Sequence, residues 1–97
     1  MERRRVVITG MGSVNPLGHS MAETWTRLKA GVSGVTRISR FDPAELGLET
    51  HIAGEVKDFD PTDYMDARAA RRMDRFGHFA VAAAAEALRE SGLVVDD

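Results

Sequence analysis

Four arginines, Arg68, Arg71, Arg72 and Arg75, open a long helical pattern that extends from residue 66 to residue 92. Their i, i+3, i+4, i+7 spacing predicts one basic stripe on a single helix. Guanidinium groups bind carboxylates and phosphates, so the stripe suits an acidic partner. Positive charge at a helix N-terminus opposes the helix dipole, which costs roughly a few tenths of a kcal/mol per residue. A solvated helix face is the alternative interpretation.

The other reactive side chains form no catalytic pattern. The sequence has no cysteine, which excludes a disulfide, a cysteine-bound metal and a thiolate nucleophile within these residues. His19, His51 and His78 have no spacing that places metal ligands on a common face. His78 stands among small apolar residues, which favours a hydrogen-bonded histidine of a core or interface. We therefore assign no catalytic residue, no metal ligand and no cofactor-binding residue.

A β-branched segment, residues 4–9, leads into a glycine loop, residues 10–18, and predicts a buried strand followed by a tight turn. Gly10 and Gly12 are spaced as in a dinucleotide-binding loop. However, Asn15 occupies the position of the third glycine, and Pro16 interrupts the expected helix start. This pattern favours a structural glycine turn over nucleotide binding.

The elements that would position these residues alternate along the chain. We expect a helix over residues 21–30, capped near Ser20 and stopped at Gly31. Strand-like segments at residues 33–43 and 51–57 flank an irregular stretch, and Asp60 with Pro61 marks a turn. The final helix should end at Gly92. The order predicts an α/β architecture without an internal boundary in residues 1–97.

Composition bounds the remaining possibilities. The 97 residues are 43% hydrophobic and 29% charged, and the net charge of −2 argues against general nucleic-acid binding. No apolar stretch approaches the roughly 20 residues of a membrane-spanning helix. Glycines interrupt the apolar run after the basic start, so no export signal is expected and the cytoplasm is the expected compartment. Residues 76–88 are apolar on nearly every face, which predicts burial within a body larger than this chain.

An ordered set of short motifs resembles the N-terminus of the β-ketoacyl-acyl carrier protein synthases, specifically the type II elongating class. The resemblance extends almost from end to end. No one motif is specific, but their order is. The motifs are RRRVVITGMG (3–12), NPLG (15–18), TWTRL (24–28), AGVSG (30–34), FD (41–42), AGEV (53–56), RMDRF (72–76) and ALRESG (87–92).

The resemblance implies the opening part of a thiolase fold, which has two similar α/β halves in an αβαβα layered arrangement. It also implies a decarboxylating Claisen condensation, in which a cysteine and two histidines act that lie downstream of residue 97. Residues 1–97 alone are therefore expected to be inactive. Family members are homodimers, and their main dimer contact is also downstream.

One functional feature of the family falls within these residues. Basic residues before the Met-Asp-x-Phe stretch dock the acidic recognition helix of acyl carrier protein, and they correspond to Arg68, Arg71 and Arg72. Arg75 is less certain, because its counterpart varies in type. The resemblance therefore implies acyl carrier protein as partner, and neither nucleic acid nor a membrane is expected.

Two alternatives remain open at this stage. The chain could be part of a condensing-like domain or chain-length-factor subunit of polyketide synthesis, which shares these N-terminal motifs. It could also be a self-contained small α/β module that recognises an acidic protein. The presence or absence of the downstream cysteine and histidines would distinguish the first alternative from an elongating synthase. Cooperative unfolding of the isolated chain would favour the second alternative.

Overall fold

The first regular element is helix α1 (Met21–Lys29). In this computed structural model, which describes residues 2–96, the Ser20 side chain accepts a hydrogen bond from the Glu23 amide at 3.1 Å and caps the helix. After the C-cap residue Ala30, Gly31 adopts a positive φ of 73°, which glycine tolerates without steric cost. The predicted helix, its cap near Ser20 and its stop at Gly31 are confirmed.

A small antiparallel sheet joins β1 (Val35–Arg37) to β2 (Ile52–Gly54). Thr36 lies opposite Ala53, and the intervening stretch forms no further helix or strand. The Glu55 carboxylate accepts hydrogen bonds from the Ser39 hydroxyl and backbone and from the Arg40 amide, which lowers its pKa below the usual 4.5. Both predicted strand regions are confirmed, each reduced to three residues.

The predicted single helix over residues 66–92 is wrong. Two helices occupy this range, α2 (Ala67–Arg71) and α3 (Arg75–Ser91), after a short 3₁₀ helix η1 (Pro61–Asp63) at the predicted turn. Asp74 breaks the helical path with an extended backbone, φ −77° and ψ 164°, and becomes the N-cap of α3. Aspartate favours such cap positions over helix interiors. The C-terminal stop at Gly92, with φ 72°, is confirmed.

The predicted buried strand over residues 4–9 is also wrong for the described chain. These residues form no strand, and Val6, Val7 and Ile8 are 90%, 73% and 80% exposed. A core strand needs hydrogen-bonded neighbours and apolar layers on its faces, and the described residues provide neither. The segment therefore has the composition of a β-strand, but no neighbouring strand within residues 2–96 with which to form a sheet.

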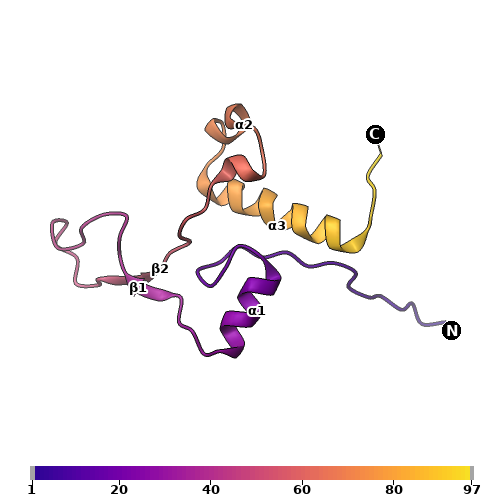
Figure 1. Ribbon diagram of the computed structural model, residues 1–97, viewed down its shortest axis with the longest axis horizontal. Coiled ribbons are helices and arrows are strands. Elements are labelled where there is room, and N and C mark those ends of the chain that lie inside the picture. Colours follow the sequence, from indigo (N-terminus) through magenta and orange to yellow (C-terminus); the bar gives the residue numbers. More distant parts are fainter. Residues whose placement is uncertain (1, 97) are drawn as a thin grey trace.

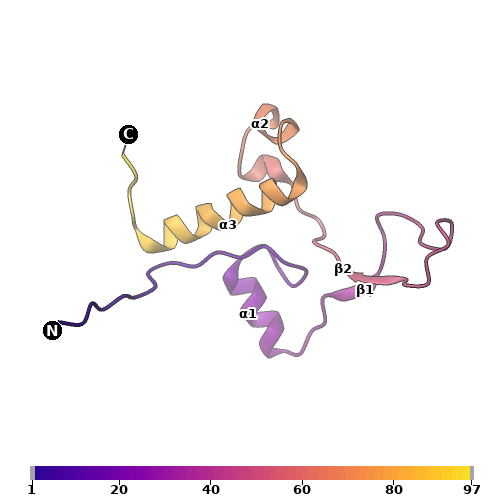
Figure 2. The same ribbon diagram turned by 180° about the vertical axis from the view of Figure 1, so that it is seen from behind.

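The glycine loop, in contrast, has a clear packing role. It follows α3 closely in both views of the ribbon (Figures 1 and 2). An added Cβ at Gly12 would collide with the backbone of Ala83, and one at Gly10 would lie 2.9 Å from the amide nitrogen of Ser91. Asn15 and Gly18 then exchange backbone hydrogen bonds of 3.0 and 3.1 Å and close the turn. The structural interpretation of these glycines is confirmed.

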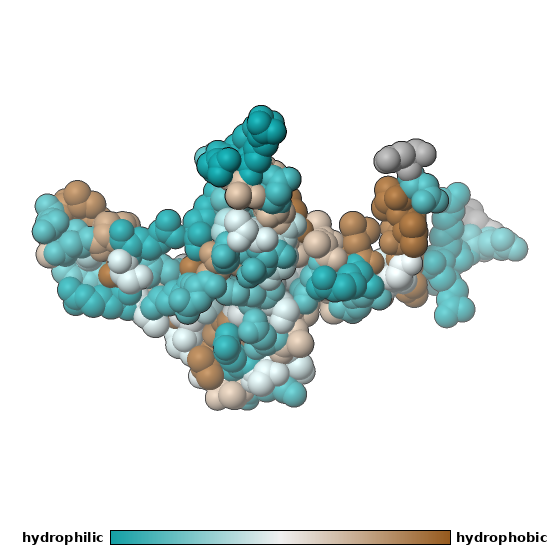
Figure 3. Space-filling view, turned by 45° about the horizontal axis from the view of Figure 1, so that its top comes forward, coloured by the Kyte–Doolittle hydropathy of each residue, from teal (hydrophilic) through white to brown (hydrophobic). Residues whose placement is uncertain are grey.

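The core of the described chain is small. Phe59, Ala70 and Ala82 are its buried hydrophobic residues, whereas Phe76 is 75% exposed. The radius of gyration is 17.4 Å, against about 13 Å for a compact domain of this size. Apolar surface also gathers near the C-terminal end, where Leu93 and Val94 are exposed (Figure 3). None of the helices in residues 2–96 is long and apolar enough to cross a membrane.

Candidate functional site

The basic patch, which we define as Arg68, Arg71 and Arg72, lies on α2. All three residues are exposed. α2 projects from the rest of the chain (Figure 1), and the corresponding region in Figure 3 is a strongly hydrophilic projection. The structure therefore places the three arginines that the resemblance identified on one short helix and its C-cap, with all three exposed.

The break at Asp74 changes the electrostatic interpretation of the patch. Arg68 and Arg71 lie in the last turn of α2, and Arg72 is its C-cap residue. Cations at a helix C-terminus interact favourably with the helix dipole, so the expected energetic penalty is wrong for Arg71 and Arg72, whereas Arg68 is the second residue of this five-residue helix. The case for a binding partner consequently depends on exposure and charge density and does not depend on stored unfavourable energy.

Arg75 is separated from the patch, so the predicted four-arginine stripe is wrong. It is half-buried at the start of α3, and its Nη2 donates a hydrogen bond to the carbonyl oxygen of Val56 at 3.2 Å. The guanidinium also lies 5.0 Å from the ring centre of Phe79 and 6.0 Å from that of Phe59. These contacts assign Arg75 a structural role between α3 and the segment that follows β2.

An aromatic cluster joins the segment that precedes α2 to helix α3. Phe59, 8% exposed, stacks on Tyr64 with ring centres 5.3 Å apart and meets Phe79 edge-on at 5.1 Å. His19 contacts the other side of the cluster, 5.3 Å from Phe59. Tyr64 is the C-cap residue of η1, and Phe79 belongs to α3. The cluster thus anchors the segment before α2 to the helix after it.

His78 links the two helices directly. Its Nε2 lies 2.8 Å from the carbonyl oxygen of Ala70, so α3 donates a hydrogen bond to α2. Its Nδ1 is buried and has no hydrogen-bond partner among the described residues. The prediction of a hydrogen-bonded histidine is confirmed, whereas the specific contact could not be read from the sequence.

Glu86, which the sequence analysis did not identify, holds the glycine loop and the start of α1 against α3. Its carboxylate accepts hydrogen bonds from the Ser13 amide at 3.0 Å and from the Met21 amide at 3.1 Å. A carboxylate at the start of α1 also complements the helix dipole. The available signal was that Glu86 is the only charged residue within residues 76–88. A lone charge in an apolar helix indicates a specific partner.

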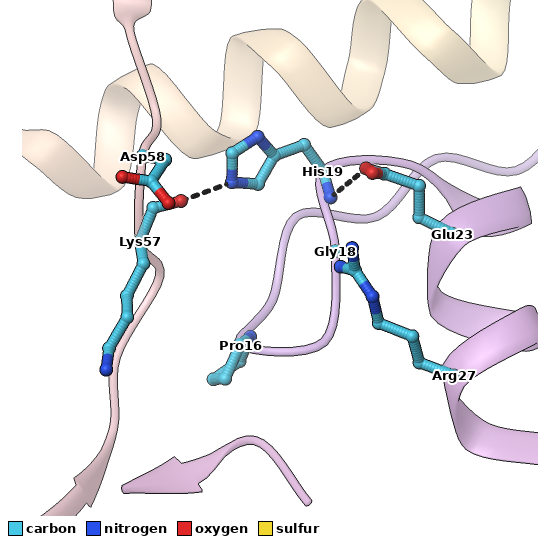
Figure 4. Close-up of a pocket in the computed structure, with 7 residues that line it drawn as sticks. All are labelled: Pro16, Gly18, His19, Glu23, Arg27, Lys57 and Asp58. Carbon is cyan, nitrogen blue, oxygen red and sulfur yellow. Dashed lines mark hydrogen bonds between the residues drawn. The ribbon is translucent and has the colours of Figure 1, made fainter. Parts of the chain in front are cut away.

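A polar pocket of about 260 Å³ lies between α1 and the segment after β2 (Figure 4). Several of its polar groups already form hydrogen bonds within the protein. His19 Nε2 lies 2.7 Å from the Lys57 carbonyl oxygen, and Glu23 accepts from the His19 amide at 3.0 Å. Arg27 donates to the Leu17 carbonyl. Positive and negative side chains are mixed in this pocket, and no nucleophile lies beside a base, so it is not a convincing catalytic site.

The three histidines form separate hydrogen bonds. His51 Nε2 lies 3.0 Å from the Leu48 carbonyl oxygen, whereas His19 and His78 contact other segments. No group of three potential metal-ligating side chains occurs within the described residues. Among the groups discussed, the basic patch is therefore the best candidate for function.

Comparison with known proteins gives a consistent result. Residues 3–97 match the family "Beta-ketoacyl synthase, N-terminal domain". Three similar proteins, each named 3-oxoacyl-[acyl-carrier-protein] synthase 2, come from Synechocystis sp., Staphylococcus aureus and Coxiella burnetii. They are 41%, 42% and 46% identical over 97, 96 and 97 residues, which is 99% or more of this chain. The chain spans 23% of the length of each of these relatives.

A solved structure supports the same relationship. The ishigamide ketosynthase/chain length factor matches with a TM-score of 0.82 and 40% sequence identity. The match covers 96% of this chain and 23% of that one. The arrangement of residues described above, although it has a small core, is thus that of a segment of a much larger known fold.

Proposed function

This chain belongs to the β-ketoacyl synthase family, and we propose that it is the opening segment of a 3-oxoacyl-[acyl-carrier-protein] synthase II. Its α/β elements correspond to the N-terminal part of a thiolase-like fold, as predicted. Residues 1–97 form one segment of the first half of that fold, without an internal boundary. The exposed apolar residues of α3 support this proposal, because they need a larger body to cover them.

The proposed parent enzyme elongates acyl chains by a decarboxylating condensation. Loss of carbon dioxide from a malonyl thioester generates the carbon nucleophile, which attacks the acyl thioester on an enzyme cysteine and displaces the thiolate. The cysteine and histidines for this chemistry lie outside the present chain, which has no cysteine. We therefore propose that residues 1–97 alone are inactive, and that the complete protein is a cytoplasmic homodimer.

The function of this segment is to dock acyl carrier protein, and the exposure of all three arginines on the projecting helix α2 carries this proposal. The family resemblance identifies the same residues, and the named relatives act on substrates held by an acyl carrier protein. Opposite charges across an interface accelerate encounter and fix its orientation. Arg68, Arg71 and Arg72 would therefore engage acidic side chains of the carrier protein before acyl transfer.

The test is the triple variant R68E/R71E/R72E in the complete synthase. Three reversed charges should raise the KM for acyl carrier protein by about tenfold or more, since each exposed pair contributes up to about 1 kcal/mol. The salt dependence of that KM should flatten, because screening has less attraction to weaken. The KM for a small acyl thioester should change little, since that substrate does not use the patch.

A matched control is R3E/R4E/R5E, which changes the net charge by the same amount at three other exposed arginines. Its KM for carrier protein should stay close to that of the unaltered enzyme. An unchanged KM in the α2 variant, or an equal rise in both variants, would show that the basic patch is an ordinary solvated helix surface with no role in docking.

The similarity to a ketosynthase/chain length factor favours one second candidate. The parent could be a ketosynthase-like subunit of polyketide synthesis that retains the same docking surface. The sequence beyond residue 97 separates the two classes, because a chain-length-factor subunit lacks the nucleophilic cysteine. The names of the three relatives favour the fatty-acid enzyme.

A further inference from the structure

We propose that His78 is a positioning residue for the docking helix: its imidazole fixes the orientation in which α2 presents the basic patch. This inference rests on the proposed docking function of Arg68, Arg71 and Arg72. It goes beyond that function because it concerns a half-buried residue of α3 outside the basic patch. The proposed role of His78 is to hold α2, the helix that carries the patch.

Helix α2 needs external support because it is only five residues long. Isolated helices shorter than about 12–15 residues are marginal in water, since few hydrogen bonds offset the cost of nucleation. Asp66 caps its start by accepting from the Ala69 amide at 2.7 Å. At its end, the Met73 amide approaches the Ala70 carbonyl at a longer 3.3 Å. Contacts with the rest of the protein must therefore set the direction in which α2 points.

The hydrogen bond from His78 acts at the centre of the basic patch. The Ala70 carbonyl belongs to the same planar peptide unit as the amide nitrogen of Arg71. The hydrogen bond of 2.8 Å from His78 Nε2 to that oxygen restrains the orientation of the Ala70–Arg71 peptide plane. The backbone of Arg71 and Arg72 follows directly from this plane. The Ala70 side chain is also buried, so this peptide is held by both packing and hydrogen bonding.

The chemistry of the ring supports a specific role over simple packing. A carbonyl oxygen only accepts, so Nε2 carries the donated proton. In the neutral ring Nδ1 is then an acceptor, and it is buried without a partner among the described residues. A buried polar atom without a partner is unfavourable, and an apolar side chain would avoid this cost. The contact with Ala70 explains why a histidine occupies the position.

Two substitutions in the complete synthase separate the hydrogen bond from the volume of the side chain. H78L introduces an apolar side chain of similar reach and removes the donor, whereas H78Q retains an N–H donor. H78L should raise the KM for acyl carrier protein about fivefold, since a net hydrogen bond is worth about 1 kcal/mol. H78Q should stay within about twofold of the unaltered enzyme.

The same variants require two further measurements. The kcat of H78L with a small acyl thioester should be retained, because the catalytic residues lie elsewhere in the parent. Amide hydrogen exchange in residues 69–73 should accelerate in H78L and recover in H78Q, since local opening of α2 exposes these amides. A loss of kcat with both substrates would show a general structural role and overturn the proposal.

R68E/R71E/R72E, measured in parallel, distinguishes the failure of each proposal. If it raises the KM for carrier protein and H78L does not, docking stands and the positioning role of His78 is wrong. If it has no effect, the docking function fails and the role of His78 in docking fails with it. Should H78L not fold, H78A replaces it, and equal KM values for H78A and H78Q would overturn the proposal.

Discussion

Two apolar groups of this chain have opposite environments. Phe59 forms a packed cluster with Tyr64 and Phe79, whereas Val6, Val7 and Ile8 are 73–90% exposed. The cluster assembles mainly from residues 59–79, with the His19 ring against one side of Phe59. The N-terminal segment has the β-branched composition of a strand but forms no strand and has no sheet beside it in the described chain. The difference separates structure that this chain specifies by itself from structure that requires the rest of the family fold.

The strongest test of this comparison is the behaviour of residues 1–97 alone. We expect no cooperative unfolding transition and strong binding of a hydrophobic dye, because large apolar side chains on α3 and at residues 6–8 remain uncovered. Amides of α3 should exchange more slowly than those of residues 2–9. A sharp thermal transition without dye binding would instead favour the self-contained module considered from the sequence.

A second test concerns the glycine loop, which joins the two regions. Replacing Gly12 by alanine in the complete protein should destabilise it by about 3 kcal/mol, because the new Cβ would lie 2.7 Å from the carbonyl carbon of Ala83. Neither backbone can yield easily. The free energy of unfolding, measured in urea, gives the effect.

Gly47 provides the control for this substitution. It has a positive φ of 70°, but an added Cβ would meet no atom within 4 Å. G47A should therefore cost only about 1 kcal/mol, from backbone strain alone. Equal losses in G12A and G47A would mean that close packing on α3 is not what requires Gly12.

The smallest expected effect concerns the caps of the two helices. D66A removes the hydrogen bond to the Ala69 amide and should cost about 1 kcal/mol, with faster amide exchange confined to α2. Asp74 makes no side-chain cap hydrogen bond, so D74A should cost less. The reverse order would show that the break between α2 and α3, rather than the cap at Asp66, sets the stability of the docking helix.

Local signals predicted a large part of the fold. The cap at Ser20, the stops at Gly31 and Gly92, and the turn at Pro61 each depend on a few neighbouring residues, and each is confirmed. The helix break was missed because Arg72 and Met73 continue the helical pattern. At the break, Asp74 has an extended backbone, and His78 and Arg75 of α3 form hydrogen bonds with other segments, which a helical pattern along the sequence does not show.

The site shows the same division between local and distant information. Charge and spacing identified Arg68, Arg71 and Arg72, whose exposure the structure confirms. The same spacing placed Arg75 with them, although the aromatic rings of Phe59 and Phe79 hold it elsewhere. Spacing along a helix cannot reveal a partner from another segment. The positioning residues His78 and Glu86 were missed as such for the same reason.

The most direct test of the account is the dissociation constant of acyl carrier protein for the complete synthase, measured by calorimetry from low to high salt. We predict that affinity falls steeply with salt for the unaltered protein and for R3E/R4E/R5E. For R68E/R71E/R72E it should be weak and nearly independent of salt. The same affinity and salt dependence in all three proteins would contradict docking through α2.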